Sequence, residues 1–393
     1  MNTALGQREE KSLLNDTRTS KRIEINYRRN KEQDNTQILD QLALDFKYEQ
    51  CNHQLWNPEK YSLMYGTPLW DASSPDQRKL LNHLYWVAYY SQIISAEIAT
   101  IFFNQTSAAG LYSLEDFRSV CDTLDLESAQ ERAHTHCFKV IAEQVEEKLF
   151  GERLFTYSMK NWASETMIFQ DTNYFKEQWK KFQLRTFALL SSSNAFIASQ
   201  YFTVRGLRTL NGKIVQHQLS EFGKTDNSPI PAKVSYHHFL DESYHFNSSQ
   251  IIGHDIINSL RAPSKFESTV ANLGVRGSLV DHSHFSLTVN GLFWYEPALF
   301  PIIYKILKSP YFEYSHSEAL MMLRKCYTRE NNALHIAAET HQVAIDSYEL
   351  YLQGLPHIWK SNREIQPMKN FSIQKYLSIN SQALKRFEAK IGR

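Results

Sequence analysis

The run from His238 to His245 constrains this chain more than any other feature, because it has the pattern H-x-x-x-E-x-x-H with Glu242 at its centre. On a helix, positions i, i+4 and i+7 lie on one face, so the run places two imidazoles and a carboxylate side by side. A shorter E-x-x-H pattern, Glu131 and His134, lies upstream. Paired E-x-x-H motifs on separate helices build the two-iron carboxylate sites of four-helix bundles. The two motifs therefore predict a metal-binding helical bundle.

A further carboxylate, Glu97, lies about one helix and one connection before Glu131 and is surrounded by isoleucines. An unpaired carboxylate in such surroundings is costly, and a bound metal removes that cost. One E-x-x-H alone usually marks a solvated helical face, and His134 alone would be read as structural. Two such motifs together with Glu97 and His238 are much less often accidental. The predicted metal ligands are Glu97, Glu131, His134, His238, Glu242 and His245.

The apolar periodicity predicts an all-α fold with four long helices and further C-terminal helices. The first long helix is predicted to start after Ser74, which can cap it, and to end at about residue 104. Pro75 suits its first position. The second is predicted over about 127–150, ending at Gly151. A short helix is expected near 114–124. The other long helices are predicted over about 175–204 and 234–260, and additional helices over 287–307 and 317–352.

Composition predicts three parts of the chain. Residues 1–45 are polar and charge-rich and are predicted to form a flexible N-terminal arm, with a short helix expected around residues 38–46. Residues 46–355 form the predicted bundle domain. Residues 356–393 form a basic, amphipathic C-terminal tail that can dock or fray.

Charge and cysteine content limit the classes of partner and compartment. Lys and Arg (43) balance Asp and Glu (42), so charge gives no reason to expect nucleic acid or an anionic membrane as partner. The four cysteines are far apart, and the N-terminus has no apolar signal core. We therefore expect a cytoplasmic protein with reduced thiols. Glu97 interrupts the most apolar stretch, 84–103, which argues against a membrane span.

The residues around the predicted site resemble a known family. Pro68-Leu69-Trp70, Ser74–Arg78 and Tyr90–Glu97, followed by the two metal motifs, are similar to the p-aminobenzoate N-oxygenase family of ferritin-like di-iron enzymes. The resemblance covers roughly residues 65–260, and the extra histidine, His238, is its most distinctive mark. It implies a ferritin-like four-helix bundle core that binds two iron ions and forms a homodimer. It also implies that Glu131 and Glu242 bridge the irons, while the other four predicted ligands bind one iron each.

The chain departs from this family at one ligand. The family has a glutamate on its third long helix, whereas residues 190–196 contain no carboxylate and place Ser193 or Asn194 at that position. Three interpretations are open. Water takes the position, another carboxylate such as Glu165 or Glu296 replaces the glutamate, or the site holds one metal or none. Asp241 is a poor substitute, because it lies about 100° around the helix from its neighbour at 242.

The predicted function is therefore that of a non-haem di-iron oxygenase that uses O2 to oxidise a small organic substrate. The resemblance implies N-oxygenation of an amine. C–H hydroxylation, desaturation, oxidative cleavage and a diverged, non-catalytic metal-binding bundle are the alternatives. The ligand set also accommodates manganese in one position. An external electron donor is expected, because the sequence contains no flavin or iron–sulfur motif, and nucleotide-binding and hydrolase motifs are also absent.

Overall fold

The structure is a computed structural model that describes residues 17–112, 117–155, 174–175, 177–179, 181–182, 197, 215–288 and 297–392. All the secondary-structure elements in these ranges are helical, which confirms the predicted all-α fold with a helical bundle core. The predicted third long helix and the 190–196 stretch lie outside the described residues, apart from a few isolated positions.

The helices follow one another along the chain in a simple order. They are α1 (Thr17–Glu32), α2 (Thr36–Asp45), α3 (Tyr48–Cys51), α4 (Pro68–Ala72), α5 (Pro75–Leu111), α6 (Arg118–Phe150), α10 (His217–Gly223), α11 (Ile230–Gln250), α12 (Lys265–Thr288), α13 (Phe300–Lys308), α14 (His316–Tyr327), α15 (Asn332–Gln353), α16 (Lys360–Arg363), α17 (Gln366–Lys369) and α18 (Ile373–Ile391). Short 3-10 turns cover Ile256–Ser259 and Pro297–Leu299, and a π-helical turn covers Ile251–Asp255.

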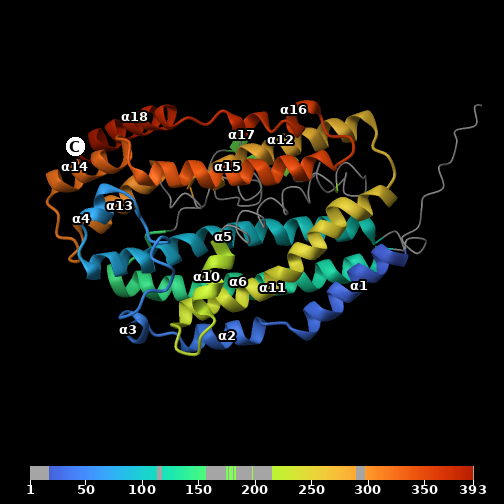
Figure 1. Ribbon diagram of the computed structural model, residues 1–393, viewed down its shortest axis with the longest axis horizontal. Coiled ribbons are helices and arrows are strands. Elements are labelled where there is room, and N and C mark those ends of the chain that lie inside the picture. The colour runs from blue at the N-terminus through green and yellow to red at the C-terminus, as the bar shows by residue number, and fades with distance from the viewer. Residues whose placement is uncertain are drawn as a thin grey trace, which may run out of the picture.

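The two longest helices, α5 and α6, pack side by side along the molecule (Figure 1). Helix α5 starts as predicted, with Pro75 in its first turn and a reciprocal capping box between Ser74 and Gln77. It continues to Leu111, beyond the predicted end. Helix α6 ends as predicted at Gly151, whose φ of 65° suits a residue without a side chain. The short helix predicted near 114–124 is part of α6 from Arg118 onward.

Helix α11 supplies the third wall of the bundle. It starts at Ile230, four residues before the predicted start at about 234, and it is α-helical only to Gln250. The π-helical turn and the 3-10 turn then complete the predicted span. Helix α10 precedes α11 and packs against it.

Residues 17–45 differ from the predicted flexible arm, although α2 covers most of the short helix expected around residues 38–46. They form α1 and α2, which pack against α6 and α11 below the central helices in Figure 1. Ile23 and Leu39 are fully buried, and so is the polar side chain of Asn30. The composition was misleading because these helices bury amides that find hydrogen-bond partners in the bundle, rather than a wide apolar face.

The C-terminal helices form a second layer above α5 and α6 in Figure 1. In it α12 packs against α15, and α18 packs against α14 with Leu384 buried. The tail thus docks through α18. The boundaries predicted between the arm, the domain and the tail stay predictions. In the described ranges, no helix combines the length and apolarity needed to cross a membrane.

One buried histidine connects the aromatic core to the segment before α4. His83 stacks on Trp56 with 4.1 Å between ring centroids. Its Nε2 donates to the carbonyl oxygen of Gln54 at 2.7 Å, and its Nδ1 accepts from the Tyr48 hydroxyl at 3.2 Å. The neutral ring is therefore satisfied, and burial lowers the pKa of His83 from 6.5 to about 4.

We expect His83 to make the protein less stable in acid. The unfolded chain binds the His83 proton more readily than the folded chain between pH 6.5 and 4, so stability is lost as pH falls through this window. The loss attributable to His83 is at most about 1.4 kcal/mol per pH unit. Denaturant unfolding between pH 7 and 4.5 should show a shallower pH slope for His83→Gln than for the wild type. The exposed His316 provides the control His316→Gln, which should keep the wild-type slope; equal slopes for all three proteins would contradict the prediction.

Candidate metal centre

Three helices bring all the sequence-predicted ligands to one place inside the bundle. Helix α5 supplies Glu97, helix α6 supplies Glu131 and His134 one turn apart, and helix α11 supplies the rest. All are buried, and the most exposed of them, Glu97, is only 6% accessible. The spacing explains this convergence, because i, i+3, i+4 and i+7 positions share one helical face. The residues from α11 are His238, Glu242 and His245.

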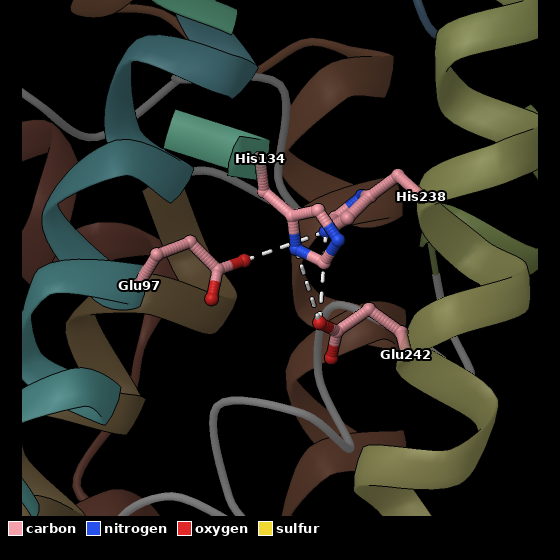
Figure 2. A group of neighbouring side chains, drawn as sticks. All are labelled: Glu97, His134, His238 and Glu242. Atoms are coloured by element: carbon pink, nitrogen blue, oxygen red, sulfur yellow. Dashed lines mark ion pairs between the residues drawn. The ribbon is translucent and has the colours of Figure 1, made fainter. Parts of the chain in front are cut away.

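These side chains form two buried groups whose ligand atoms lie within 4.8 Å of one another, and each group could hold a metal ion. The first group contains Glu97, His134, His238 and Glu242, which point toward one another from α5, α6 and α11 in Figure 2. The second group contains Glu131, Glu242 and His245. The two groups share Glu242. A carboxylate that belongs to both groups has the placement expected of a bridge between two metals.

Close contacts between oxygen and nitrogen atoms hold the second group together. His245 Nδ1 lies 2.9 Å from Glu242 Oε1 and 3.3 Å from Glu131 Oε1. Glu131 Oε2 lies 3.1 Å from His134 Nδ1, so this carboxylate faces histidines of both motifs. Hard carboxylate oxygens combined with imidazole nitrogens are a donor set that suits iron and manganese.

His238 gives an independent indication that the pocket is built for a ligand. Neither of its ring nitrogens has a hydrogen-bond partner, although the residue is fully buried. Its Nε2 lies 3.4 Å from Glu97 Oε1 and 3.7 Å from Glu242 Oε1, facing both carboxylates without bonding to either. Buried polar atoms in native proteins are almost always paired, and a metal ion would pair this nitrogen. The residues present therefore fit a metal.

His238 and His134 have pKa values that are shifted in opposite directions. Burial, with a smaller contribution from the nearby His134, lowers the pKa of His238 to about 3. Burial also opposes the charge on His134, but hydrogen bonds to Asp241 and Glu131 outweigh it and raise the pKa of His134 to about 9. Burial raises the pKa of Glu131, yet His245 and His134 hold it well below its usual range. The Glu131 carboxylate is thus held as an anion, as a metal ligand must be.

Two residues that were not predicted as site residues form hydrogen bonds with the outer ring nitrogens of His134 and His245. His134 Nε2 donates to Asp241 Oδ2 at 3.1 Å, and His245 Nε2 donates to Gln130 Oε1 at 2.9 Å. Each bond holds a proton on Nε2, so Nδ1, which faces the carboxylates, is the nitrogen that would give up its proton to a metal. Asp241, which we considered only as a substitute ligand, supports a histidine of another helix. The signal was present in the sequence, because Asp241 and Gln130 each directly precede a predicted bridging glutamate.

Aromatic rings close the site on the His238 side. Phe138 and Tyr90 lie with their ring centroids 4.9 Å and 5.9 Å from that of His238. The Tyr90 hydroxyl donates to Ser235 Oγ at 2.9 Å, so it is satisfied away from the metal ligands. All these aromatic and serine side chains are buried, which keeps this wall free of water. The proposed replacements Glu165 and Glu296, and the Ser193/Asn194 position, lie outside the described residues.

Comparison with known proteins identifies a family for almost the whole chain. A family model described as acyl halogenase CylC-like matches residues 18–388. This ferritin-like family is related to the p-aminobenzoate N-oxygenases, but the match does not show membership of the N-oxygenase family itself. No curated protein and no solved structure matches the chain.

The Asp241 contact generates a direct prediction. We expect Asp241→Asn to weaken metal binding by about 10- to 100-fold, because the amide has lost the charge that assists the His134 hydrogen bond. Anaerobic titration with Fe(II) or Co(II) measures the affinity, and circular dichroism verifies the fold. Asp255→Asn is the control, since Asp255 is partly exposed and pairs with Arg22 away from the cluster. Equal affinities for the wild type and Asp241→Asn would contradict the prediction.

Proposed function

The chain belongs to the CylC-like acyl halogenase family, and on this premise we propose that it is a non-haem di-iron enzyme that uses O2 to replace a C–H bond of an acyl substrate with a carbon–halogen bond. The observation that carries the proposal is the convergence of the six predicted ligands into two buried groups that share Glu242. The aromatic wall around His238 supports oxidative chemistry, because it keeps the centre dry.

In this proposal two metals divide the ligands between them. Glu97, His134, His238 and Glu242 would hold one metal, and Glu131, Glu242 and His245 would hold the other. Iron is proposed in both positions, and manganese fits one of them. When bound, such a metal pair supplies the activation of O2 that oxidises an unreactive bond.

The chain's own residues prepare this chemistry. Asp241 and Gln130 hold the outer protons of His134 and His245, so that the inner ring nitrogens are available as donors. Phe138 and Tyr90 exclude water from the face beside His238. Glu131 and Glu242 offer anionic oxygens to neighbouring positions in a site of low dielectric constant, where such charges act most strongly.

The sequence leaves room for a halide as well. Residues 190–196, which by resemblance correspond to the family glutamate on the third long helix, carry no carboxylate. A metal position without a protein anion can accept a halide ion, and this is the role that we propose for it.

The overall reaction requires electrons from a donor outside the chain. Converting C–H and halide into C–halogen while O2 is reduced to two water molecules consumes two electrons and three protons. The sequence contains no flavin or iron–sulfur motif, so we propose an external electron donor. A cytoplasmic location and a homodimer remain part of the proposal, as does the absence of nucleic acid and membrane partners.

N-oxygenation of an amine is the second candidate function. It is favoured by the H-x-x-x-E-x-x-H run and by the placement of Glu97 beside His238, which follow the pattern of the N-oxygenases that the chain resembles. The two candidates share the metal centre and differ in substrate and in their need for halide.

Because Glu242 belongs to both ligand groups, we expect one substitution at this residue to weaken the binding of both metals. We expect the wild type to bind about two irons and Glu242→Gln to lose most of both, because an amide can neither carry the charge nor bridge two metals. Metal analysis after anaerobic loading and desalting measures this. The control is Glu146→Gln, since Glu146 is an equally buried glutamate on α6 that binds Arg153 instead. It should lower stability but leave the iron content unchanged, whereas two irons in Glu242→Gln would argue against the bridge.

Product analysis distinguishes the two functions. Iron-loaded protein, a chemical reductant and O2 are supplied with a mixture of fatty acyl thioesters and aryl amines, with chloride, with bromide or without halide. We expect halide-dependent products whose mass and isotope pattern show one halogen, and a change of pattern when bromide replaces chloride. Hydroxylamine or nitro products that form equally well without halide would instead establish N-oxygenation.

A further inference from the structure

The two residues that support the ligand histidines are themselves held by the N-terminal helices. On α1, Asn30 forms a reciprocal amide pair with Gln130, with Asn30 Nδ2 3.0 Å from Gln130 Oε1 and Gln130 Nε2 2.9 Å from Asn30 Oδ1. Both side chains are fully buried. The same Gln130 oxygen accepts the proton of His245 Nε2 at 2.9 Å. A direct chain of hydrogen bonds therefore runs from α1 to a predicted ligand.

A second chain of the same kind starts between α1 and α2. The backbone nitrogen and the side-chain nitrogen of Asn35 both donate to Asp241 Oδ1, at 3.1 Å and 2.7 Å. This leaves Asp241 Oδ2 for His134 Nε2 at 3.1 Å. His237, on the opposite side of Asn35, contacts Asn35 Oδ1 at 2.9 Å and fixes which end of the amide faces Asp241.

From these contacts we propose that α1 and α2 are an outer lock of the metal centre, in which Asn30 and Asn35 are positioning residues that set the ring orientation and the protonated nitrogen of His245 and His134. The inference deepens the proposed function and rests on it, since the lock has a role only if the centre binds metal. It assigns a task to the segment that composition alone predicted to be a flexible arm.

The chemistry of the Gln130 amide explains why Asn30 is needed. An amide has an acceptor end and a donor end, and in the reciprocal pair the Gln130 amide can turn over only if the Asn30 amide turns over with it. If the amide turned over, its nitrogen would face His245 Nε2 and would favour the proton on Nδ1. The nitrogen that faces Glu131 and Glu242 would then be blocked for a metal.

The Asn35 contact acts on Asp241 in a different way. Two donors on Oδ1 stop the carboxylate from rotating and stabilise its charge. The bond from His134 to this carboxylate is charge-assisted, whereas the bond from His245 to Gln130 goes to a neutral oxygen. The two histidines are therefore supported separately and unequally, so each asparagine should affect its own histidine.

The test uses the full-length protein labelled with 15N at histidine. In the metal-free wild type, we expect the Nε2 protons of both histidines to give slowly exchanging NMR signals, because both are buried and hydrogen-bonded. Asn30→Ala should release the His245 proton and leave that of His134, and Asn35→Ala should do the reverse. A titration with Co(II) as the probe should then show affinities about 10- to 100-fold lower for both variants.

A matched control separates positioning from stability. Asn362 is also a buried asparagine, and its hydrogen bonds to Asn272 join α16 to α12, which are far apart in the sequence. It lies in the C-terminal layer, away from the centre. Asn362→Ala should lower the unfolding temperature without changing either histidine signal or the Co(II) affinity. If an alanine variant does not fold, Asn30→Ser or Asn35→Ser, which shortens the side chain but keeps a polar group, is measured in its place.

The outcomes distinguish the lock from the function on which it rests. Selective loss of one histidine signal in each variant, together with weaker Co(II) binding, supports the lock. Wild-type signals and wild-type affinity in both folded variants would overturn it even if the metal centre is real. A wild-type protein that binds no Co(II) would overturn the proposed function and the positioning role with it, and the metal titration of the wild type alone identifies that case.

Discussion

The interaction on which the rest of the structure depends is the mutual compensation of buried carboxylates and imidazoles between α5, α6 and α11. A carboxylate in the interior of a protein is expensive unless it is paired, and Glu97, Glu131 and Glu242 lie almost wholly out of contact with solvent. The pairing groups in the structure include the histidines that lie one turn away or on a facing helix. The long helices must therefore keep their register, because a shift of one residue would turn these groups into the apolar core.

The same requirement explains the arrangement of side chains around the cluster. His134 and His245 can present one nitrogen inward only if the other is occupied, and Asp241 and Gln130 occupy it. Those two residues are buried in turn and need partners of their own, which Asn35 and Asn30 supply. Each buried polar group thus finds its hydrogen-bond partner one layer further from the centre, and the outermost partners lie in the α1–α2 segment. The apolar contribution comes from the aromatic side, where Phe138 and Tyr90 pack against His238.

Membership of the CylC-like acyl halogenase family agrees with this reading of the site, and it moves the emphasis from nitrogen oxidation toward halogenation. The departure at Ser193 and Asn194 looked like a defect when the N-oxygenases were the reference. Under the proposed halogenase function, a position without a protein carboxylate would leave room for the halide. The bundle and its ligand cluster are compatible with either reaction, so the identity of the substrate depends on side chains beyond the cluster.

The helical fold and the positions of the predicted ligands could be read from the sequence, because both follow from local spacing. Ser74, Pro75 and Gly151 marked helix ends through backbone chemistry, and the i, i+4 and i+7 spacing of His238, Glu242 and His245 decided which face carries the ligands. The residues that support them became visible only in the folded structure. Asp241 points away from its own ligand face and reaches a histidine on α6, and the polar segment 17–45 docks through buried amides rather than through an apolar stripe. Contacts of that kind join residues far apart in the chain, so the local periodicity of the sequence does not predict them.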